Sequence, residues 1–152
     1  MKHRWAALVV VLALGALVPT VAAAQGTMNS TLGGQRGPGF ELGQNFPNPF
    51  NSATTIPFTI GDPPTCTDAG HLYHVTLRIY NVLAQPVAVP ILQNGDGAMG
   101  QPVQNLTLQC GQYTAYWNGA YLNTSTSVPS GVYLYSIEVD GRSVVKKMIV
   151  MK

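Results

Sequence analysis

Residues 131–151, GVYLYSIEVDGRSVVKKMIVM, give the clearest indication of the fold that we expect for this chain. Apolar and polar side chains alternate on both sides of Asp140-Gly141, and alternation from residue to residue is typical of a half-buried β-strand. Asp-Gly is a dipeptide that a type I′ turn favours, because both central residues of that turn need positive φ. The stretch therefore predicts a β-hairpin whose strands cover residues 131–139 and 143–151.

The first strand of this hairpin carries large apolar side chains on both of its faces. A strand that is apolar on both faces is typical of the interior of a sheet. One face would hold Tyr133, Tyr135, Ile137 and Val139, and the other would hold Val132 and Leu134. We therefore expect residues 131–139 to form a central strand.

Short apolar runs of the same kind follow one another from Phe40 onward, and no long stretch repeats apolar residues at helical spacing. Turn-forming segments separate them, such as residues 94–97 and 118–119, in which glycine supplies positive φ. The runs cover residues 54–60, 74–80, 87–92, 103–110 and 112–117. Together with the hairpin, these about seven short strands predict an all-β fold, a single Ig-like antiparallel β-sandwich. Residues 87–92 and 103–110 would form a lateral hairpin or a crossover.

Two of these runs indicate which faces are buried. In residues 54–60, the side chains of Ile56, Phe58 and Ile60 share one face, and in residues 74–80 those of Val75, Leu77 and Ile79 do so. Pro57 has no N–H to donate to a neighbouring strand, so we expect residues 54–60 to form an edge strand.

The N-terminus resembles a secretory signal peptide. Lys2 and Arg4 precede an apolar run of 14 residues, and Ala22 to Ala24 form a small-residue cleavage site before Gln25. The apolar run is shorter than the roughly 20 residues of a transmembrane helix. We expect cleavage after Ala24, with an uncleaved anchor as the alternative.

Removal of residues 1–24 would leave a flexible, Gly-rich leader of residues 25–39 and one domain of residues 40–152. Of the eight basic residues, Lys2 and Arg4 would be lost, so six basic and six acidic residues would remain. A formal net charge of zero gives no electrostatic reason to expect a nucleic-acid partner. We also expect no transmembrane span after cleavage.

Cys66 and Cys110 are the two cysteines, and an even count in an exported chain indicates a disulfide. The closed loop of about 45 residues would contribute roughly 3–4 kcal/mol in the chain-entropy description. The alternative is two free, buried thiols.

The sequence offers little that could support catalysis, because no nucleophile with a base and no pair of carboxylates can be identified. The best chemical candidate is a metal-binding cluster of Cys66, Asp68, His71 and His74. Against it, Cys66 has a disulfide partner in prospect and Asp68 lies in a turn. We expect no enzyme, no metal and no cofactor.

The aromatic side chains have two interpretations. They could line a groove for a carbohydrate or a peptide, although aromatic residues on strands more often pack in the core. We expect core positions for Tyr113, Tyr116, Trp117, Tyr133 and Tyr135.

Five blocks of sequence, in this order, resemble the type A C-terminal sorting domains of the type IX secretion system. The blocks are QNFPNPFN (44–51) with TTIPF (54–58), LRIYNVLAQ (77–85), YWNG (116–119), PSGVYLY (129–135) and KKMIVMK (146–152). The same pattern is similar to the Ig-like domain of flagellar hook-capping proteins, and it covers about residues 40–152. The motif residues are Asn45, Phe46, Pro47, Asn48, Pro49, Phe50, Tyr80, Asn81, Trp117, Gly119, Ser130, Gly131 and Tyr133.

The motif residues suit a sandwich. The two prolines would hold residues 46–50 extended, Phe46 and Phe50 would anchor that segment on the core, and Gly131 would permit a close approach of the backbone. The sequence departs from the family at Ser52, Ala84 and Asn118. Ala84 replaces a glycine and so puts a positive-φ turn at that position in question.

The resemblance implies export through the Sec route, folding in the periplasm and recognition by an outer-membrane translocon. It also implies trimming by a sortase-like peptidase with attachment to surface lipopolysaccharide. Lys146, Lys147, Met148 and Lys152 form the candidate recognition tail. The alternative for these lysines is protection of a solvated edge strand. The alternative function is a structural or adhesive subunit of the cell envelope that assembles through β-strand edges.

Overall fold

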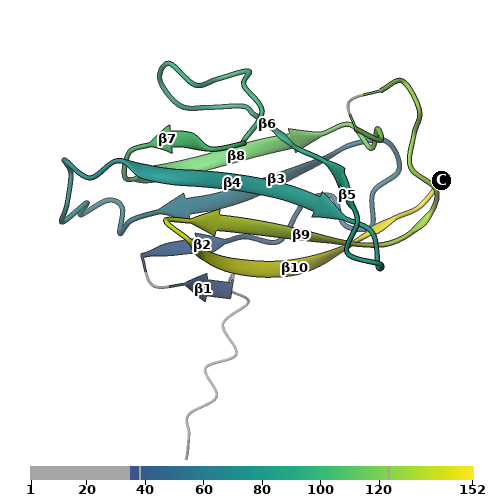
Figure 1. The fold of residues 1–152 in the computed structure, drawn as a ribbon, viewed down its shortest axis with the longest axis horizontal. Helices are drawn as coiled ribbons and strands as arrows, with labels where there is room; N and C mark the ends of the chain where they lie inside the picture. Colours follow the sequence, from purple (N-terminus) through teal and green to yellow (C-terminus); the bar gives the residue numbers. More distant parts are fainter. Residues whose placement is uncertain (1–34, 38, 123) are drawn as a thin grey trace, which may run out of the picture. The chain divides into compact units, whose positions relative to one another are not determined.

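The computed structural model describes residues 35–37, 39–122 and 124–152, and in this part of the chain the fold is an antiparallel β-sandwich (Figure 1). The predicted signal peptide and most of the predicted leader lie outside the described residues. Within them, no helix is long and apolar enough to span a membrane. The predicted all-β fold class is confirmed.

The first sheet has the strand order β1-β2-β3-β8-β6. Its strands are β1 (Gln35–Gly37), β2 (Phe40–Leu42), β3 (Thr54–Ile60), β8 (Gly111–Trp117) and β6 (Ile91–Leu92). The residues of β1 belong to the segment expected as leader, yet they pair with β2. The sandwich therefore starts before residue 40.

The second sheet has the strand order β10-β9-β4-β5, and β7 pairs with the other half of the same β4 edge. Its strands are β10 (Arg142–Val150), β9 (Gly131–Val139), β4 (Tyr73–Tyr80), β5 (Pro86–Ala88) and β7 (Leu106–Leu108). The predicted central position of residues 131–139 is confirmed, because β9 lies between β10 and β4.

The core fills the space between the two sheets, and the predicted inward faces supply it. From the first sheet Ile56, Phe58 and Ile60 are buried, and from β4 the side chains of Val75, Leu77 and Ile79 are fully buried. The inward face of β9 is buried as well, at Tyr133, Tyr135, Ile137 and Val139. The alternation read from the sequence thus gives the correct face for these three strands.

The hairpin of β9 and β10 has the turn that its sequence predicts. Asp140 and Gly141 have φ values of 48° and 78°, and Val139 pairs directly with Arg142. Positive φ at both central residues is the requirement of a type I′ turn.

The expectation that residues 54–60 form an edge strand is wrong, since β3 lies between β2 and β8. Pro57 is accommodated because the chain after β2 is irregular opposite it. Gly43 N donates to Pro57 O at 2.8 Å, and the next paired residues are Phe46 and Thr55. Three residues on one side thus face two on the other, which is a β-bulge that leaves the proline nitrogen without a required partner.

Residues 87–92 and 103–110 form a crossover and not a hairpin. β5 pairs with β4 in the second sheet, whereas β6 pairs with β8 in the first sheet, so the chain changes sheet between Ala88 and Ile91. It returns to the second sheet in β7, which pairs with β4.

The predicted disulfide is confirmed. Cys66 and Cys110 are bonded, with their Cα atoms 5.7 Å apart. The bond joins the loop between β3 and β4 to the residue before β8. We call this side of the sandwich the disulfide end.

Candidate functional site

The motif blocks meet at the opposite side of the sandwich, which we call the C-terminal end. There β3 begins, β8 ends, β9 begins and β10 ends (Figure 1). Thr54 pairs with Trp117 in one sheet, and Gly131 pairs with Val150 in the other. Phe50 connects the two sheets. It forms a β-bridge with Val150 at the end of β10, and in the chain it lies just before β3 starts.

Residues 44–51, which we call the clamp segment, run along the outer edge of β10. Phe50 N donates to Ile149 O at 3.0 Å, and Met151 N donates to Phe50 O at 2.8 Å. In addition to these backbone bonds, Ile149 N donates to the side-chain Oδ1 of Asn48 at 2.9 Å. The clamp segment therefore satisfies backbone groups of β10 at an edge that no strand of the described residues pairs with.

Asn45 fixes the conformation of the clamp segment from inside. Its side chain is 2% exposed, and Nδ2 donates to Pro47 O at 3.1 Å and to Thr54 Oγ1 at 2.9 Å. Its backbone N donates to the hydroxyl of Tyr135 at 3.1 Å, and that hydroxyl donates to Gly43 O at 2.9 Å. Burial raises the pKa of Tyr135 to about 12, so this hydroxyl keeps its proton at physiological pH.

Three aromatic motif residues form a chain behind the clamp segment. The ring centroids of Phe50 and Trp117 are 5.5 Å apart, and those of Trp117 and Tyr133 are 6.0 Å apart, both in edge-to-face geometry. The polar atoms of two of these rings are satisfied locally, because Trp117 Nε1 donates to Ala120 O and the Tyr133 hydroxyl donates to Pro129 O. These rings bind the clamp segment to both sheets.

Gly119 is required by a close approach at the same end. Its φ is 70°, and a Cβ atom there would lie 3.1 Å from Ser52 O. Asn118 completes the turn, since its Oδ1 accepts from Ala120 N at 3.0 Å. The turn is thus in place with Ser52 and Asn118, the two residues here that differ from the sorting-domain pattern.

Two of the roles predicted for motif residues are wrong. Phe46 does not anchor the core, because its side chain is 78% exposed, whereas Phe50 is 2% exposed. Phe46 forms a bridge to Thr55 with its backbone, and this leaves its ring pointing outward. Gly131 makes no close approach, since a Cβ there would have Tyr133 Cε2 as its nearest neighbour at 4.0 Å.

The turn in the block LRIYNVLAQ is present despite the alanine that replaces glycine. Ala84 has a φ of 58°, and its N donates to Asn81 O at 3.0 Å. The side chain of Asn81 also accepts from the backbone N of Leu83 and of Gln85, each at 3.0 Å. Asn81 therefore organises the turn, and Tyr80 ends the strand before it.

Lys146, Lys147 and Met148 of the candidate recognition tail lie in the folded strand β10, and Lys152 follows it. Met148 is fully buried, so a receptor cannot contact its side chain in the folded domain, and that assignment is corrected. Lys146 is on the inward side and is partly buried, whereas Lys147 is exposed on the outer face. Lys152 is exposed, and its N donates to Ser130 Oγ at 2.8 Å.

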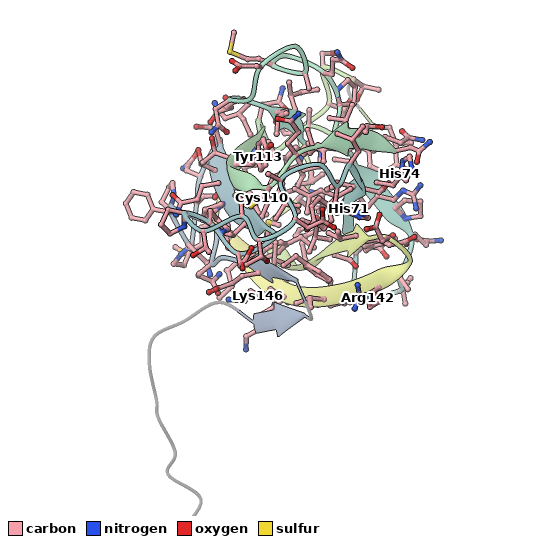
Figure 2. All side chains as sticks on the ribbon, turned by 90° about the vertical axis from the view of Figure 1, so that its left-hand side faces the viewer. His71, His74, Cys110, Tyr113, Arg142 and Lys146 are labelled. Carbon is pink, nitrogen blue, oxygen red and sulfur yellow. A yellow bond between two sulfur atoms is a disulfide. The ribbon has the colours of Figure 1, made fainter. Side chains whose placement is uncertain are left out.

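The residues of the suggested metal cluster lie at the disulfide end, onto which Figure 2 looks. Cys66 is bonded to Cys110 and so offers no thiolate. His71 Nε2 lies 2.9 Å from Asp140 Oδ2 and Nδ1 lies 3.9 Å from Asp68 Oδ2. No three His, Cys, Asp or Glu side chains converge as metal ligands within the described part of the chain.

Asp140 is a structural residue of the hairpin turn. Its Oδ1 accepts from His74 N at 2.9 Å, in addition to the His71 contact. The His71 hydrogen bond, followed by that of the His74 backbone, lowers the pKa of this carboxyl below 3.8. Asp140 therefore ties the disulfide loop to the hairpin.

The aromatic residues divide between core and surface. Trp117, Tyr133 and Tyr135 are buried as expected. Tyr113 is partly buried against Phe58, with ring centroids 5.5 Å apart. Tyr116 is 37% exposed on the outer face of the first sheet, so its predicted core position is wrong.

The chain matches no protein-family model, no curated protein and no solved structure in comparisons of its sequence and fold.

Proposed function

We propose that this protein is a non-catalytic sorting or anchoring module that a type IX secretion machinery recognises for outer-membrane translocation and cell-surface attachment. The partners in this proposal are the translocon and a sortase-like peptidase, with surface lipopolysaccharide as the attachment point. The mature protein would pass through the periplasm and remain at the cell surface or outside the cell.

The observation that supports this proposal most is the convergence of the motif blocks on the C-terminal end, where β10 ends. Asn48 is 101 residues from Ile149, and Asn45 is 90 residues from Tyr135, yet each pair is hydrogen-bonded. The resemblance to sorting domains rests on these same blocks. The clamp segment among them holds the end of the last strand in one defined conformation, which suits a module that is recognised by its C-terminal part.

The proposal is tested with a reporter enzyme placed between the signal peptide and residues 25–152. The fusion is expressed in a type IX-competent bacterium and in a matched strain that lacks the translocon. We expect reporter activity outside the competent cells and in the periplasm of the deficient strain. A reporter that stays in the periplasm of both strains would contradict the proposal.

The alternative, an envelope subunit that assembles through strand edges, has less support. β5 and β6 are edge strands of three and two residues, and the clamp segment occupies the outer edge of β10 near its end. β1 lies beside β10 as well. Short or covered edges disfavour strand addition. Light scattering that gives the molar mass of a monomer at every protein concentration would rule this alternative out.

A further inference from the structure

Exposed apolar side chains are concentrated at the C-terminal end. Twelve large apolar side chains of the described residues are exposed, and eight of them lie there. Five are on its loops, namely Phe46, Val82, Leu83, Tyr121 and Leu122. Three flank the end of β10, namely Val132, Ile149 and Met151, and the first two of these are direct cross-strand partners. Monomeric proteins rarely gather exposed apolar groups in one region unless it binds something.

The carboxylate side chains, in contrast to the exposed apolar ones, lie away from the C-terminal end. All six carboxylate side chains of the chain fall within the described residues. None lies at the C-terminal end, because they are in β2, in the loops of the disulfide end and in the hairpin around Asp140. Lys147 and Lys152 are exposed beside the apolar groups. The C-terminal end therefore carries exposed apolar groups and two exposed lysines but no carboxylate side chain.

This surface is held in a fixed shape, which lowers the entropy cost of binding. The clamp segment is hydrogen-bonded to β10, and Asn81 fixes the turn that carries Val82 and Leu83. The loop after β8 is held by Leu122 N, which donates to Val87 O at 2.7 Å. The exposed apolar groups thus stand on well-defined turns.

We propose that the C-terminal end is a docking surface for an envelope protein whose binding site is an apolar pocket bordered by carboxylates. This rests on the proposed function and names the chemistry of the partner. Carboxylates on the partner would complement Lys147 and Lys152, and its apolar pocket would cover exposed apolar side chains of this end, of which Phe46 and Leu83 are the most exposed at 78% and 75%.

Two other occupants fit the observations less well. Two lysines contribute only about 1 kcal/mol each at an anionic membrane, and lipid recognition takes a larger cluster of basic residues. Exposed polar groups of Asn51, Ser52 and Ser127 lie among the apolar ones and would lose water without gaining hydrogen bonds in lipid. A second copy would offer carboxylates at its disulfide end, but its exposed large apolar groups away from the C-terminal end are few and scattered.

The first experiment compares surface variants in the reporter fusion. Phe46→Ser with Leu83→Ser removes two exposed groups of the docking surface. Leu72→Ser with Met99→Ser is the matched control, since these side chains are 51% and 69% exposed elsewhere. We expect the docking variant to lower the exported fraction about tenfold, which corresponds to roughly 1.4 kcal/mol of binding, and the control to leave it unchanged. Equal export of both variants would overturn the inference, provided that thermal melting shows both to be folded.

The second experiment identifies the class of occupant and does not depend on export. A photo-crosslinking amino acid replaces Leu83 or, as the control, Met99 in the full chain in living cells. We expect a crosslink to one envelope protein from position 83 that Lys147→Glu with Lys152→Glu abolishes, and none from position 99. Absence of that crosslink overturns the inference, as does binding of the purified protein to anionic vesicles or its self-association through position 83. A crosslink without export of the wild-type fusion would instead contradict the proposed function and leave the docking surface standing.

Discussion

Replacement of Tyr135 by phenylalanine removes the single hydroxyl oxygen that is hydrogen-bonded to the backbone at the start of the clamp segment. The ring stays in the core, where Tyr135 is fully buried, so packing is unchanged. The hydroxyl accepts from Asn45 N at 3.1 Å and donates to Gly43 O at 2.9 Å. The substitution therefore leaves one donor and one acceptor of the backbone without their partner.

The size of the effect follows from the burial of these two groups. Asn45 is 2% exposed, so its N–H cannot find water, and an unsatisfied buried group costs about 1–3 kcal/mol. Gly43 is only partly buried, and water can replace part of its lost bond. We expect Tyr135→Phe to lower the free energy of unfolding by about 2–3 kcal/mol, from the sum of one full and one partial loss.

The measurement is urea unfolding of residues 25–152 with the disulfide intact, followed by tryptophan fluorescence. With a slope of about 1.5 kcal/mol per molar urea, the midpoint should fall by about 1–2 M at constant slope. Tyr116→Phe is the matched control, because Tyr116 lies on the surface. If the two variants unfold at the same urea concentration, the hydrogen bonds of the Tyr135 hydroxyl do not stabilise the clamp segment.

Three further substitutions test other parts of the structure. Asp140→Asn keeps a turn-forming residue but removes a carboxylate whose pKa is lowered in the folded state. The contribution of this carboxylate to the free energy of unfolding is present above pH 3.8 and is lost as the pH falls towards the lower pKa of the folded state. The variant should therefore be less stable than wild type at neutral pH and approach it in acid, as chemical unfolding across pH would show. Ala84→Gly should raise the free energy of unfolding by about 0.5–1 kcal/mol in a urea titration, since relief of the left-handed strain exceeds the entropy that glycine adds to the unfolded chain; a loss of stability would argue against the positive φ. Gly43→Ala should lower the thermal midpoint, because its Cβ would lie 2.8 Å from Pro57 O and overpacking costs about 1–3 kcal/mol, whereas Gly70→Ala, with open space around it, should melt like wild type.

The expectations that depend on local pattern were the ones that the structure confirmed. The alternation in residues 54–60, 74–80 and 131–139 identified the buried faces, because neighbouring side chains of a strand must point to opposite sides. Asp140-Gly141 identified the hairpin turn from the φ values that it tolerates. An even cysteine count identified the disulfide between Cys66 and Cys110.

The expectations that failed concern groups whose surroundings come from distant parts of the chain. Pro57 indicated an edge strand, but the bulge after β2 accommodates it in the interior of a sheet. Phe46 looked like a core residue, yet its backbone bridge to Thr55 turns the ring outward. Ala84 put its turn in question, but hydrogen bonds that Asn81 accepts from Leu83 N and Ala84 N hold the turn in place with Ala84 in the left-handed region.

The fold class, the buried faces of three strands, one turn and the disulfide could be predicted from the residues alone, because each depends on residues that are neighbours in the chain or on a single pair. The three-dimensional arrangement was needed to show that the clamp segment closes over β10, that Met148 is buried beside exposed Lys147, and that the exposed apolar groups and lysines share one end. The clamp joins residues about a hundred positions apart, such as Asn48 and Ile149, and local alternation carries no information about which strand edges come together.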